Sequence, residues 1–74
     1  MDVRTNFPPY WRMAARLRNW LIARGVEPRE LADAVGVFPF LVSLWLDGQC
    51  LPTPDQGEQI GAYLRVDDEP FWRE

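Results

Sequence analysis

The segment Leu31–Pro52, which reads LADAVGVFPFLVSLWLDGQCLP, constrains the fold of this chain more than any other. It begins with apolar residues at helical spacing, and Gly36 can then adopt the left-handed backbone conformation that ends a helix. A second helix is expected over about Pro39–Asp47, because Gly48 can end it and Pro52 cannot continue it. The segment therefore predicts two short helices joined by a tight turn.

The residues before this segment also favour helices. One helix is expected over Pro9–Ala23, with Gly25 ending it, and the next is expected to begin at Pro28, after Glu27, and to end at Gly36. On the first helix the three-four spacing predicts one face that is apolar until its last turn: Met13, Leu17, Trp20, Leu21 and Arg24. A second, polar face is expected to be exposed to solvent: Arg12, Arg16 and Asn19.

The last predicted helix has the strongest start signal in the chain. Thr53 is a favourable N-cap, Pro54 suits the first helical position, and Gln56 completes a capping box. The inward residues expected on this helix are Ile60, Tyr63 and Leu64, with Val66 following.

The predicted organisation is an N-terminal arm over residues 1–9, a helix-turn-helix domain over residues 10–66, and a C-terminal tail or short helix over residues 67–74. The sequence contains no strand-like alternation and no internal repeat. The expected fold class is therefore a compact all-α domain of four helices plus a short C-terminal turn.

Composition excludes several classes of function. The chain has one cysteine, Cys50, and no histidine, whereas structural zinc needs several such ligands and histidine is the commonest general base. We therefore expect no metal, no cofactor, no small-molecule substrate and no enzymatic activity. The longest apolar run, Phe38–Leu46, has about half of the ~20 residues that cross a bilayer. Because the N-terminus also has no apolar signal-peptide core, the expected location is cytoplasmic.

Charge is distributed unevenly along the chain, whose net charge is −3. Residues 1–37 carry six arginines and four acids, whereas residues 38–74 carry two arginines and seven acids. DNA-binding domains are usually basic, because neutralising phosphates supplies much of their affinity. The second half would therefore repel a phosphate backbone unless its acids face away from it.

From roughly Leu17 to Val66 the sequence resembles the Cro and lambda-repressor type (XRE-like) helix-turn-helix family. The spacing between the two helices of the motif and their turn has no insertion. The positions that match the family's core pattern are Leu17, Leu21, Val26, Leu31, Ala32, Val35, Gly36, Val37, Val42, Trp45, Gly48, Pro52, Ile60, Leu64 and Val66.

The resemblance implies a small DNA-binding transcriptional regulator that acts as a homodimer on double-stranded DNA. In that family the second helix of the motif enters the major groove. The residues that this implies for phosphate contacts are Arg12, Arg16 and Arg29. The residues that it implies for the reading region are Pro39, Phe40, Ser43, Leu44 and Gln49. Phe71 and Trp72 are candidates for a dimer contact.

The reading region departs from the family's usual residues. Phe38 stands where the family commonly has Ser or Thr, Phe40 and Leu44 replace polar residues, and Gln49 and Cys50 replace Lys or Arg. Pro28 also stands where a Gln commonly begins the first helix of the motif. Phe40 and Leu44 offer no bidentate base contact and are limited to apolar contacts with thymine methyl groups.

Two alternatives explain this apolar helix without base reading. In the first, the domain binds and modulates a partner protein by docking Phe38, Phe40 and Leu44, with Cys50 alongside, into a groove of that protein. In the second, the same side chains are internal and are covered by the aromatic arm Phe7–Trp11 or by the C-terminal tail. The sequence leaves both alternatives open.

Overall fold

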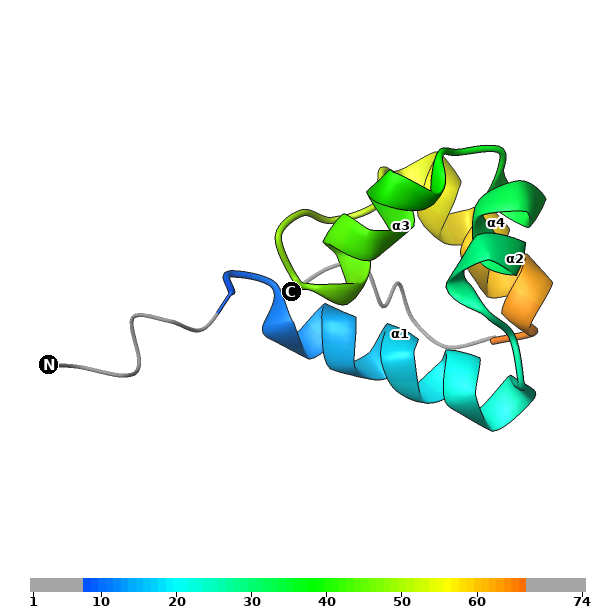
Figure 1. Cartoon of the computed structure of the whole chain (residues 1–74), viewed down its shortest axis with the longest axis horizontal. Coiled ribbons are helices and arrows are strands. Elements are labelled where there is room, and N and C mark those ends of the chain that lie inside the picture. Colours follow the sequence, from blue (N-terminus) through cyan, green and yellow to red (C-terminus); the bar gives the residue numbers. More distant parts are fainter. Residues whose placement is uncertain (1–7, 67–74) are drawn as a thin grey trace, which may run out of the picture.

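Four helices joined by short turns make up most of the residues that the structure describes (Figure 1). The structure is a computed structural model, and it describes residues 8–66. In chain order the helices are α1 (Trp11–Arg24), α2 (Pro28–Val35), α3 (Pro39–Leu46) and α4 (Pro54–Leu64). Residues 8–66 contain no strand, so the predicted all-α fold of four helices is confirmed. The predicted C-terminal turn, with Phe71 and Trp72, lies outside the described residues.

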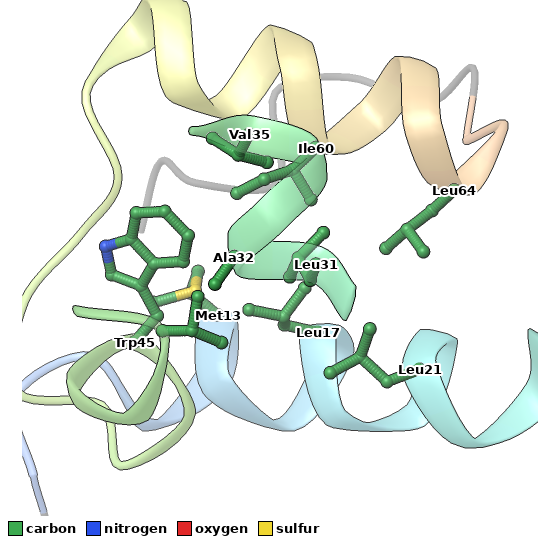
Figure 2. Close-up of a cluster of buried hydrophobic side chains, with 10 residues drawn as sticks. Met13, Leu17, Leu21, Leu31, Ala32, Val35, Trp45, Ile60 and Leu64 are labelled. Atoms are coloured by element: carbon green, nitrogen blue, oxygen red, sulfur yellow. The ribbon is translucent and has the colours of Figure 1, made fainter. Parts of the chain in front are cut away.

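The core forms where the four helices meet (Figure 2). α2 packs against both α3 and α4, and α1 packs against the same two helices. Trp45 has no exposed surface, which confirms the inward position predicted for it. The other buried apolar side chains are Met13, Ala14, Leu17, Leu21, Leu31, Ala32, Val35, Val42, Ile60 and Leu64.

The helix ends follow the local signals in the sequence. Gly25 and Gly36 have φ angles of 65° and 79°, and each ends its helix in the left-handed conformation that glycine adopts without steric cost. At the start of α4, the backbone N–H of Gln56 donates to Oγ1 of Thr53 over 3.2 Å, and the backbone N–H of Thr53 donates to Oε1 of Gln56 over 2.9 Å. The predicted capping box is confirmed.

Two details of the prediction are wrong. α1 begins at Trp11 instead of Pro9, because Tyr10 has non-helical backbone angles, φ −115° and ψ 42°, and is the N-cap. Its backbone N–H donates to the carbonyl oxygen of Gly48. Tyr63 is 43% exposed and does not point inward. The buried stripe of α4 runs through Gly57, Ile60 and Leu64, so Tyr63 falls at the edge of this stripe.

Candidate functional site

The turn between α2 and α3 holds the second helix in a fixed place. The backbone N–H groups of Gly36 and Val37 both donate to the carbonyl oxygen of Ala32, over 2.8 and 3.0 Å. Three residues therefore suffice to join α2 to α3, which begins at Pro39. α3 buries one side, through Val42 and Trp45.

The other side of α3 faces outward. Pro39, Phe40 and Ser43 are exposed there, whereas Leu44 is half-buried. Gln49, just beyond the helix, is also exposed. The structure thus brings the sequence-predicted reading region together on one helix and the turn that follows it.

Both phenylalanines of the described residues, Phe38 and Phe40, are solvent-exposed, with exposed fractions of 84% and 72%. The hypothesis that they are internal is therefore wrong. Their neighbours Leu44 and Cys50 are half-buried, and Cys50 packs against the core as a free thiol. The apolar face of α3 consists of Phe38 and Phe40, with Leu44 beside them.

The start of α3 has no side-chain cap. Phe38 occupies the N-cap position with φ −70° and ψ 145°, the extended conformation that a capping Ser or Thr also adopts. Pro39 at the first helical position has no backbone N–H, so one donor that would otherwise need a partner is missing from this end.

The end of α3 is fastened to α1. The guanidinium of Arg18 donates to the carbonyl oxygen of Leu46 over 2.8 Å. The backbone N–H of Tyr10 donates to the carbonyl oxygen of Gly48 over 3.0 Å. Gly48 is buried in this contact, because a Cβ there would lie 3.0 Å from Cβ of Pro8 and 3.2 Å from the backbone N of Trp11. These contacts fix the direction of α3 relative to α1.

Arginines on α1 divide into two pairs with different roles. Arg18 and Arg24 point at helix ends, since Nε of Arg24 donates to the carbonyl oxygen of Leu64 at the end of α4. A cation at a helix C-terminus is favourable, because the last carbonyls carry partial negative charge. All four are exposed, as predicted for Arg12 and Arg16, and the Arg12 guanidinium lies 5.2 Å from the ring centroid of Trp11.

The described residues 38–66 carry three acids and one arginine, so they are less negative than residues 38–74 as a whole. Four of the seven acids in residues 38–74 belong to residues 67–74, outside the described part of the chain. α1 carries four arginines and no acid. Arg29, in the first turn of α2, is exposed as well. On α3 and its C-cap, Asp47 is the one charged residue.

Sequence reasoning missed the contacts of Arg18 and Gly48. Each joins residues that lie far apart in the chain, 28 positions in the case of Arg18, so no local pattern could reveal them. Ile22 was missed as well, and it is 73% exposed on α1.

The described residues form neither a cluster of metal ligands nor a membrane-spanning helix. Within residues 8–66, no three His, Cys, Asp or Glu side chains lie together in a way that could hold a metal ion. None of the helices in the same range has the length and apolar character that crossing a membrane requires.

No protein-family model, no curated protein and no solved structure matches this chain.

Proposed function

We propose that this chain is a small DNA-binding transcriptional regulator of the Cro and lambda-repressor type, acting in the cytoplasm as a homodimer. The observation that carries the proposal is the placement of α3. A three-residue turn joins it to α2, Val42 and Trp45 fix its inner side, and its opposite side is exposed along Pro39, Phe40 and Ser43. A helix presented in this way is suited to lie in the major groove.

Exposed arginines supply the phosphate contacts in this proposal. Arg12, Arg16 and Arg29 are exposed, whereas Arg18 and Arg24 already donate to the carbonyls of Leu46 and Leu64. The number of phosphates neutralised by one domain is therefore about three. The logarithm of the binding constant should fall with the logarithm of the salt concentration with a slope of about −2.7 for each bound domain.

A salt titration with random-sequence duplex DNA tests the proposal. We expect the affinity of one domain to fall about 40-fold between about 50 and about 200 mM salt. Arg16→Gln should make the slope shallower by about 0.9, because one phosphate contact is lost. Arg65→Gln is the matched control: it removes the same charge from an exposed residue at the end of α4 and should leave the slope unchanged. Undetectable binding at the lowest salt would contradict DNA binding.

A second candidate function is a protein-interaction module. The exposure of Phe38 and Phe40 favours it, because exposed apolar side chains on a helix often anchor protein interfaces. In this case a partner protein from the host should co-purify with the chain and be lost on Phe40→Ser, while duplex DNA should not bind. Phe40→Ser should leave the thermal melt intact, because the side chain is exposed. Co-purification that survives this substitution would contradict a partner site on α3.

A further inference from the structure

The outward side of α3 offers an unusual set of chemical groups to a ligand. From Phe38 to Leu46 there is no arginine, lysine, asparagine, glutamine, aspartate or glutamate. Ser43 is the one exposed residue of this stretch with a polar side chain. Its two exposed aromatic side chains, Phe38 and Phe40, are hydrocarbons without a hydrogen-bonding group.

This set of groups can be compared with what each base shows in the major groove. Guanine is read by Arg or Lys at O6 and N7, adenine by Asn or Gln at N6 and N7, and cytosine by an acid at its amino group. None of these side chains occurs on α3. Thymine alone among the four bases also presents a methyl group, which an apolar side chain such as Phe can contact.

We propose that Phe38 and Phe40 recognise the 5-methyl groups of thymines in the major groove, so that this chain prefers A·T-rich sites. The inference rests on the proposed DNA-binding function and adds the sequence preference to it. Both side chains lie at the N-terminal end of α3, the end from which recognition helices contact base edges. Gln49, exposed just after the C-terminal end of α3, has a side-chain amide of the kind that reads adenine.

The geometry at this end of α3 supports such a contact. The backbone N–H of Leu41 donates to the carbonyl oxygen of Phe38 over 2.9 Å, and Pro39 fixes the backbone between the two phenylalanines. The rings are therefore carried by an ordered backbone, so their contact with a row of methyl groups would not require this end of the helix to reorder. Removing one contacted methyl group should weaken binding about fourfold.

Thymine replacement tests the proposal with two pairs of duplexes. The first pair has one fixed A·T sequence, with thymine in one duplex and deoxyuridine, which lacks only the methyl group, in the other. The second pair has one fixed G·C sequence, with cytosine or 5-methylcytosine, which places a methyl group in the same groove. We expect binding to the thymine duplex to be about 15-fold tighter than to the uracil duplex if two methyl groups are contacted. The methylated G·C duplex should likewise bind more tightly than the unmethylated one.

Two variants assign the effect to α3. Phe40→Ala should reduce the thymine preference about fourfold without changing the melting temperature or the salt dependence, because its side chain is exposed. Ile22→Ala truncates a similarly exposed apolar side chain on α1 and should leave the preference unchanged.

The outcomes separate this inference from the proposed function. Salt-dependent binding that is equal for thymine and uracil would overturn methyl recognition and leave DNA binding intact. A uracil effect without a 5-methylcytosine effect would also overturn it, because duplex stiffness and not methyl contact would then be the cause. A preference that persists in Phe40→Ala and in Phe38→Ala would overturn the assignment to these residues. No binding to any duplex would overturn both the inference and the function.

Discussion

Trp45 is the largest side chain that the fold buries completely, and its indole N–H has no hydrogen-bond partner among the described residues. A buried tryptophan usually satisfies this donor, because leaving it unpaired costs free energy. The Trp45 ring therefore stabilises the folded domain through apolar contacts alone. Its position was predictable from its three-residue spacing from Val42, whereas the missing partner was not, because hydrogen-bond partners depend on tertiary packing.

Substitution of Trp45 separates the contribution of ring volume from that of the donor. Trp45→Ala should lower the free energy of unfolding by about 3–5 kcal/mol, enough to unfold a small domain. Trp45→Phe keeps an aromatic ring and loses a donor that has no partner. The free energy of unfolding should therefore fall by well under half of the loss expected for Trp45→Ala. Urea denaturation followed by circular dichroism measures both. Equal losses for the two variants would show that the N–H group matters after all.

At the scale of helices, α3 and α4 begin in the same way but differ in their caps. Each has a proline at its first position and an extended N-cap residue, yet Thr53 accepts a hydrogen bond and Phe38 cannot. We expect Thr53→Ala to destabilise the domain by about 1 kcal/mol and Phe38→Ser to stabilise it by a similar amount. Thr53→Ser, which keeps the hydroxyl, is the control for the first change. Melting temperatures that shift in the same direction for Thr53→Ala and Phe38→Ser would contradict this account of the caps.

The sequence predicted the elements whose ends depend on local chemistry. Pro28 and Thr53 mark helix starts and Gly36 a helix end, and each acts within a few residues of its own position. The start of α1 was misplaced because Tyr10 has a non-helical backbone and its N–H bonds to Gly48, 38 positions away, which no local pattern reveals. The same limit applies to the candidate site. Its residues followed from the motif, but the exposure of Phe40 depended on which segments cover α3.

At the scale of the whole molecule, Gly48 is where the start of α1 meets the end of α3. Gly36 and Gly48 have similar φ angles, 79° and 73°, but only at Gly48 would a Cβ meet neighbouring atoms. Gly36→Ala should therefore cost only backbone strain, about 1 kcal/mol. Gly48→Ala should cost a further ~1–3 kcal/mol, because the Cβ would press on the backbone of residues 10 and 11. If chemical denaturation shows the same loss in free energy of unfolding for Gly36→Ala and Gly48→Ala, the close contact at Gly48 is contradicted.

The two carbonyl contacts of α1 have a consequence for how the domain opens. Arg18 and Arg24 attach the ends of α3 and α4 to one helix, across 28 and 40 positions of sequence. Detachment of α1 would free both of those ends and uncover the core residues Met13 and Leu17 at the same time. Because α2 packs against the same two helices as α1, we expect the slowest amide hydrogens of all four helices to exchange with solvent through one shared opening.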